Sequence, residues 1–171
     1  LRVLTLVMLT GLITTQFIFG QAWLDNPYFG YRMPIVINNT TGVELTEFQV
    51  QITLGSSFPW VHANADISDI RFTAPDGETL IPYWIESFSQ YASAIIWVRV
   101  PILAAGTSTT IYLYYGNASI TTGASSGDDT FDFFDDFEGT VLNTTKWNPL
   151  GAGSAVLNGG YLTLNSTGVF D

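Results

Sequence analysis

The chain has 171 residues, with 5 Lys+Arg against 15 Asp+Glu, a formal net charge of −10, one His and no Cys. Five cations cannot form the positive face that replaces phosphate counterions, so a nucleic-acid partner is excluded. Zinc-finger, haem-attachment, iron–sulfur and disulfide frameworks are excluded by the missing Cys and the single His. Hydrophobic residues make up 47% and charged residues only 12%, which predicts a chain that buries a core.

Residues 1–22 have the pattern of an export segment. Arg2 precedes an apolar run from Val3 to Phe19, and Gly20-Gln21-Ala22 places small residues before a cleavage point. We expect either a signal peptide that is cut after Ala22 or a retained membrane anchor helix. Both alternatives place the rest of the chain outside the cytoplasm, secreted or at the cell surface, with this segment as its membrane contact.

The rest of the chain predicts an all-β fold, because short alternating runs are separated by turn residues. In Thr46–Leu54 every second residue is apolar, with Ile52 on one face and Gln51 and Thr53 on the other. Further strands are expected over Ile35–Asn38, Asp69–Thr73, Leu80–Glu86, Ile95–Val100, Thr110–Tyr115, Ala155–Leu157 and Tyr161–Asn165. The pattern favours an antiparallel β-sandwich of jelly-roll type.

The composition changes near residue 120, which predicts more than one structural unit. Residues 28–120 carry most of the strand patterns, and residues 118–130 are rich in Gly, Ser and Thr, as linkers are. Residues 131–171 are too few to form a stable domain alone. We expect them to be the first part of a second β domain that is incomplete here, or strands that pair with the first domain.

Four motifs follow one another in a fixed order, and together they resemble a known family. They are Asp69-Ile70-Arg71-Phe72, Tyr83-Trp84-Ile85-Glu86, Trp97-Val98-Arg99-Val100-Pro101 and Tyr112-Leu113-Tyr114-Tyr115-Gly116-Asn117. Over about residues 28–120 the chain resembles the secreted domain of unknown function 2341 family. Residues 131–171 are similar to the first strands of a concanavalin-like, laminin-G-like lectin domain. The resemblance implies a β-rich extracytoplasmic module, often linked to lectin-like domains, and it implies no particular activity.

The sequence offers no catalytic constellation. His62 is the single His, and no nucleophile elbow accompanies it. The acidic residues lack the paired spacing that glycosidases need. We therefore expect a non-catalytic binding module, although an accessory part of a larger polysaccharide-active enzyme or of an envelope transport or sensor protein remains an alternative.

Two aromatic residues in predicted loops suggest a carbohydrate contact. Trp60 and Tyr91 could offer exposed rings on which a sugar stacks, and His62 and Gln90 lie near them in sequence as hydrogen-bonding groups. The expected partner is a carbohydrate or another polymer of the cell envelope. The alternative is that Trp60 is folded inward and that the domain is a structural spacer, adhesin or filament subunit.

An acidic cluster follows the predicted linker. On a strand, Asp132, Asp136 and Glu138 would share one face while Asp135 pointed to the other. Closely spaced carboxylates suit Ca²⁺, so a structural calcium site is one expectation, although the order of an EF-hand loop is missing. The alternative is a solvated acidic edge that keeps the chain soluble. No other cofactor is expected.

Five sequons predict possible glycosylation in an exported chain, at Asn38, Asn39, Asn117, Asn143 and Asn165. The first three lie at predicted turns, where Asn is also a good turn residue without any glycan. Among the charged residues of the motifs, Asp69 and Arg71 are two positions apart, so we expect a local ion pair on one strand face.

Overall fold

The computed structural model describes residue 24, residues 28–148 and residues 153–166. The chain divides into two compact units, Leu1–Asp132 and Phe133–Asp171, called unit 1 and unit 2 below. The predicted export segment at residues 1–22 lies outside the described residues. Within the described part, no helix is long and apolar enough to cross a bilayer.

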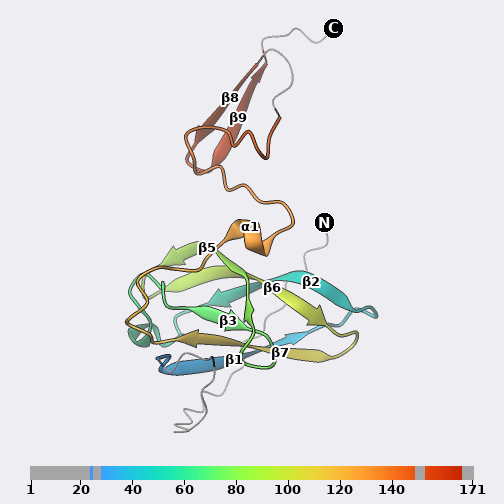
Figure 1. Cartoon of the computed structure of the whole chain (residues 1–171), viewed down its shortest axis with the longest axis vertical. Helices are drawn as coiled ribbons and strands as arrows, with labels where there is room; N and C mark the ends of the chain where they lie inside the picture. The colour runs from blue at the N-terminus through green and yellow to red at the C-terminus, as the bar shows by residue number, and fades with distance from the viewer. Residues whose placement is uncertain (1–23, 25–27, 149–152, 167–171) are drawn as a thin grey trace. The chain divides into compact units, whose positions relative to one another are not determined.

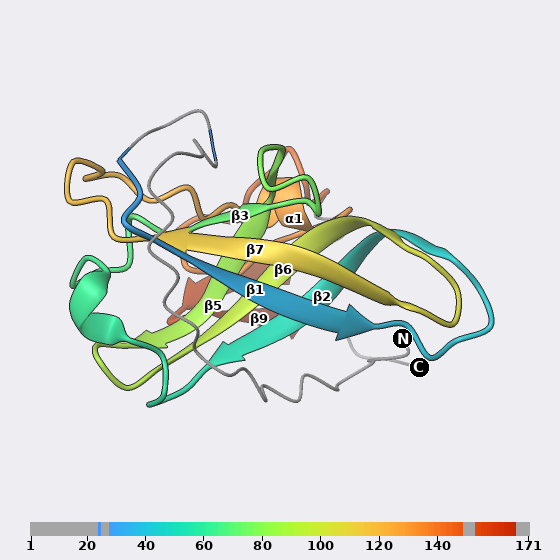
Figure 2. The same cartoon turned by 90° about the horizontal axis from the view of Figure 1, so that it is seen from below.

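Unit 1 is an antiparallel β-sandwich, as the alternating sequence predicts (Figures 1 and 2). One sheet has the order β1 (Tyr31–Asn38), β7 (Ser108–Tyr115), β3 (Arg71–Thr73) and β4 (Leu80–Ile81). The other has the order β2 (Leu45–Leu54), β6 (Ser93–Leu103) and β5 (Tyr83–Ser89). The described residues of unit 1 also form two short helices, η1 (Trp60–His62) and α1 (Gly127–Thr130).

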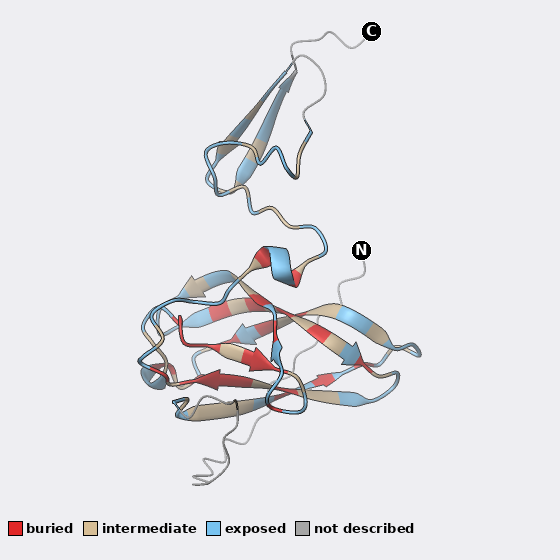
Figure 3. Cartoon of the chain, viewed as in Figure 1, coloured by how far each residue is buried: buried red, intermediate tan, exposed pale blue. Residues whose placement is uncertain are grey.

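The core lies between the two sheets, and the register of β2 and β6 shows how it is built. Ile52 of β2 pairs with Ile96 of β6, and the two side chains are 1% and 0% exposed. Thr53, one residue further, is exposed. Because side chains alternate between the faces of a strand, this confirms the predicted period of two. Figure 3 shows buried residues on the strands of both sheets.

The segment predicted as one strand, Leu80–Glu86, is divided at Pro82 into β4 and β5. Proline has no N–H to donate to a ladder, so a strand tends to break there. The carbonyl of Pro82 still accepts a hydrogen bond from the backbone N–H of Arg99 at 3.0 Å. The chain changes sheets at this point, since β4 pairs with β3 and β5 pairs with β6.

Residues 118–132, which we call the strap, run along the outer edge of β5 rather than away from the sandwich. The Ser126 N–H donates to the carbonyl of Tyr83 at 2.8 Å, and the Ile85 N–H donates to Ser125 Oγ at 2.9 Å. The Phe131 ring lies 5.9 and 5.8 Å from the rings of Trp84 and Trp97. The segment predicted as a linker thus covers an edge strand, which would otherwise offer unpaired backbone groups to other chains.

In the described part of unit 2, β8 (Gly153–Asn158) and β9 (Tyr161–Ser166) form a β-hairpin with a sheet of its own. Gly159 and Gly160 form the turn with φ of 55° and 78°, values that favour glycine. Residues 131–138 form no strand, so the expected alternation of the acidic cluster is wrong.

Candidate functional site

Trp60 is a core residue, and the prediction that it offers an exposed ring is wrong. Its side chain is only 6% exposed, and its Nε1–H donates to the carbonyl of Gly55 at 3.0 Å. The ring contacts Phe58 at 4.7 Å and Phe88 of β5 at 6.0 Å between centroids. An indole buries a large apolar area once its N–H has a partner, which explains the inward orientation.

Tyr91 is the exposed aromatic residue at the tip of the hairpin between β5 and β6. Its side chain is 56% exposed, and its φ of 57° lies in the left-handed region that favours glycine. The turn is closed by the Ala92 N–H, which donates to the carbonyl of Ser89 at 3.0 Å. Holding a residue with a side chain in this conformation costs about 1–2 kcal/mol. Such strain at an exposed position is a feature of binding loops.

His62 and Gln90 are exposed as well, so three of the four predicted ligand-binding residues reach solvent. The His62 ring stacks on Tyr31 of β1 with centroids 4.2 Å apart and an angle of 21°. The contact between Trp60 and Phe88 holds η1 beside the hairpin that carries Tyr91, at one end of the sandwich (Figure 2). We call these residues, 60–62 and 90–91, the loop end.

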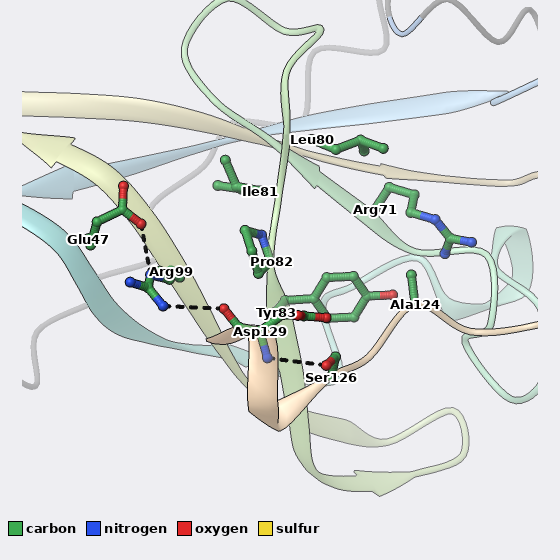
Figure 4. Close-up of a pocket in the computed structure, with 10 residues that line it drawn as sticks. All are labelled: Glu47, Arg71, Leu80, Ile81, Pro82, Tyr83, Arg99, Ala124, Ser126 and Asp129. Atoms are coloured by element: carbon green, nitrogen blue, oxygen red, sulfur yellow. Dashed lines mark hydrogen bonds and ion pairs between the residues drawn. The ribbon is translucent and has the colours of Figure 1, made fainter. Parts of the chain in front are cut away.

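A groove of about 430 Å³ opens elsewhere on unit 1, and no motif in the sequence predicts it (Figure 4). Arg99 crosses one end, where its Nε lies 2.7 Å from Glu47 Oε2 and its Nη2 lies 3.2 Å from Asp132 Oδ1. The lining residues come from both sheets and the strap: Glu47, Arg71, Leu80, Ile81, Pro82, Tyr83, Arg99, Ala124, Ser126 and Asp129. Two of the chain's five Lys and Arg residues therefore line one groove.

Asp69 does not pair with Arg71, so the predicted ion pair is wrong. Asp69 is fully buried, and its carboxylate accepts three backbone hydrogen bonds. They come from the N–H groups of Asn64 at 2.9 Å, Gly116 at 2.7 Å and Asn117 at 3.1 Å. A buried carboxylate that accepts several backbone N–H groups is well compensated without a cation. Asp69 thus joins two loops that are far apart in the sequence.

Arg71 lies at the other end of the groove and donates to backbone carbonyls. Its Nη1 donates to Ser68 at 2.9 Å and Ile70 at 2.6 Å, and its Nη2 donates to Thr122 of the strap at 3.3 Å. The Tyr83 hydroxyl donates to the same Ile70 carbonyl at 2.8 Å. Burial raises the pKa of this hydroxyl, and the nearby Arg71 charge opposes part of that increase.

Carboxylates of the acidic cluster have partners within the chain, and the expected calcium site stays a prediction. Asp132 pairs with Arg99, and Asp135 accepts hydrogen bonds from Trp147 Nε1 at 2.6 Å and from the Phe137 N–H at 2.9 Å. Asp136 accepts from the N–H of Glu138 at 3.2 Å. Among the described residues, no three Asp, Glu, His or Cys side chains are placed to hold a metal ion.

Two of the five predicted glycosylation sites are buried. Asn39 is 2% exposed and its Nδ2 donates to the carbonyls of Val43 and Leu103, while Asn117 is 3% exposed and its Oδ1 accepts from the Ser119 N–H. These side chains stabilise turns and are not accessible in the folded chain. Glycosylation stays a prediction for the three exposed residues Asn38, Asn143 and Asn165.

A model of the family described as Domain of unknown function (DUF2341) matches residues 66–150. Neither the comparison with curated proteins nor that with solved structures gives a match. The match begins after β2, so β1 and β2 lie outside it. Their partners β7 and β6 lie inside the matched range. The similarity of residues 131–171 to a lectin domain stays a prediction. The four motifs all lie within the matched range, and the chain is thus confirmed as similar to the DUF2341 family over residues 66–150.

Proposed function

We propose that this chain is an extracytoplasmic, non-catalytic module that contacts carbohydrate or another cell-envelope polymer through its loop end. The observation that carries the proposal is Tyr91, which is 56% exposed at φ 57°. Glycine would occupy this turn position without strain. A tyrosine at the same position lowers the stability of the fold, and a contact made by its ring is a physical reason for that cost.

The residues of the loop end suit a saccharide. A phenol ring offers a flat apolar face for a sugar ring and a hydroxyl for one hydrogen bond. Gln90 adds amide donors and acceptors, and His62 is held in place by its stack on Tyr31. The platform is small and open, so the affinity for one short oligosaccharide is expected to be weak.

The test separates binding from stability with one substitution. Tyr91→Gly should raise the free energy of unfolding by about 1 kcal/mol because the strain is removed, and it should abolish binding. Tyr28→Ala is the matched control, because Tyr28 is also exposed, at 67%, and should bind as the wild type does. Titrations of the full chain would use cellohexaose, xylohexaose and chitohexaose, together with a glycan array. No binding by the folded wild type, or binding that survives Tyr91→Gly, would contradict the proposal.

A rigid spacer is the second candidate function, and the strap is the observation that favours it. Gln49 Nε2 of β2 donates to the carbonyl of Thr130 at 3.0 Å, and Thr130 is fully buried. The chain therefore leaves the sandwich of unit 1 from a fixed position. A wild-type protein that binds no glycan but shows strongly protected amides over residues 118–132 in hydrogen exchange would favour this function.

A further inference from the structure

The groove between the sheets and the strap has the size of a ligand site. Its volume of about 430 Å³ lies within the usual range for small-ligand pockets, about 300–1,000 Å³. Figure 4 shows Arg71 at one end, the Glu47–Arg99 pair at the other, and Pro82 and Tyr83 between them. The Glu47–Arg99 end thus carries both charges, whereas Arg71 is the charged lining residue at the other end.

The Arg71 end fits a carboxylate. A guanidinium has five N–H donors; three of those of Arg71 donate to backbone carbonyls, and the Tyr83 hydroxyl is a further neighbour of this guanidinium. Among the described residues, no carboxylate lies within ion-pair distance of Arg71. Its charge is therefore available to an anion that enters the groove, and guanidinium groups bind carboxylates through two parallel hydrogen bonds.

The opposite end fits hydroxyl groups. Glu47 and Asp129 line it with carboxylates, which accept hydrogen bonds, and the Arg99 guanidinium beside Glu47 donates them. Leu80, which is 55% exposed, and Pro82 give the groove an apolar wall between the two ends. A ligand that carries one carboxylate, several hydroxyl groups and an apolar ring face would match all three parts.

We propose that this groove binds a hexuronic acid residue of a polysaccharide, with its carboxylate on Arg71 and its hydroxyl groups toward Glu47 and Asp129. The choice of a saccharide rests on the proposed function, whereas the site is different from the loop end. The net charge of −10 repels densely charged polyanions at long range. The groove therefore favours a mainly neutral glycan in which acidic residues are isolated.

The experiment compares methyl β-glucuronide with methyl β-glucoside, its neutral counterpart, by NMR titration of the full chain. Leu80→Lys and Leu80→Glu form a matched pair at an exposed position, where substitutions affect the fold little. We expect the Lys variant to bind the glucuronide about two- to fivefold more tightly and the Glu variant to bind it about two- to fivefold less tightly. Binding of the neutral glucoside should not change between the two variants.

Arg71→Gln should weaken glucuronide binding by at least about tenfold, as loss of a charge-assisted pair does. Arg32→Gln is its control, because Arg32 lies over the Tyr112 ring and does not line the groove. Tyr91→Gly separates the two proposals: it should leave glucuronide binding unchanged even where it abolishes binding at the loop end. Equal affinity for glucoside and glucuronide, no response to the Leu80 charge pair, or acetate binding as tightly as glucuronide would overturn the inference.

Discussion

Asp69 allows the sharpest test of how unit 1 is held together. Its carboxylate accepts the backbone N–H groups of Asn64, Gly116 and Asn117 while it is fully buried. Asp69→Ala would leave three donors without a partner, and each buried unsatisfied group costs about 1–3 kcal/mol. These costs are not additive, because the loops can relax and admit water. We therefore expect the free energy of unfolding to fall by about 3–5 kcal/mol, a large part of the total stability of an ordinary domain.

The assay is urea unfolding followed by tryptophan fluorescence, with a thermal melt beside it. For a unit of this size the melting temperature should fall by roughly 10–20 °C. Asp69→Asn should lose less stability than Asp69→Ala. The amide oxygen can still accept a hydrogen bond, while the NH₂ group faces at least one of the backbone donors. Asp66→Asn is the control, since Asp66 is exposed and its hydrogen bonds are local, to Ser68 and its own backbone. An Asp69→Ala variant that unfolds within about 1 kcal/mol of the wild type would refute the reasoning.

Three further predictions test the core, the tyrosines and the strap. Ile52→Ala should lower the free energy of unfolding by about 2–5 kcal/mol, whereas Thr53→Ala, its exposed neighbour, should cost less than about 1 kcal/mol in the same urea titration. Burial, together with Tyr31, raises the pKa of Tyr115 from 10.0 to about 12. The folded state thus retains the proton of the Tyr115 hydroxyl more strongly than the unfolded state. The contribution of Tyr115 to the free energy of unfolding is therefore present below pH 10 and is lost as pH rises toward 12. Stability against urea should fall in this window, and the fall should be smaller in Tyr115→Phe. Phe131→Ala should speed amide exchange over residues 118–132, and unchanged protection there would show that its ring does not hold the strap.

The strands could be predicted from the sequence because their signal is local. Alternation across Thr46–Leu54 places Ile52 in the core, and the structure agrees. The division at Pro82 was missed although proline carries a signal for it, because a two-residue strand such as β4 has almost no pattern of its own. Composition also failed to predict that the strap packs on β5. Its hydrogen bonds join backbone atoms and small hydroxyl groups, and a flexible linker has the same residue types.

The candidate sites were harder to predict because they depend on contacts across the fold. Trp60 and Tyr91 both look like loop aromatics in the sequence, yet Trp60 is 6% exposed and Tyr91 is 56% exposed. The difference comes from Phe88 and Gly55, which give the Trp60 indole its contacts and its hydrogen-bond acceptor. For Asp69 the nearest cation was the obvious partner, whereas its true partners include two amides about fifty residues away.

The pairing of β1 with β7 also determines when unit 1 can fold. Among the described strands of unit 1, β1 is the first to be synthesised, but Asn38 meets its partner Ser108 only 70 residues later. Sheets built from such distant pairs fold slowly, because the closure of a long loop must precede the contacts that reward it. The first strand therefore stays without its partner while most of the unit is delivered. Pro34, which cannot donate to a neighbouring strand, reduces the risk that β1 pairs with another chain during that interval.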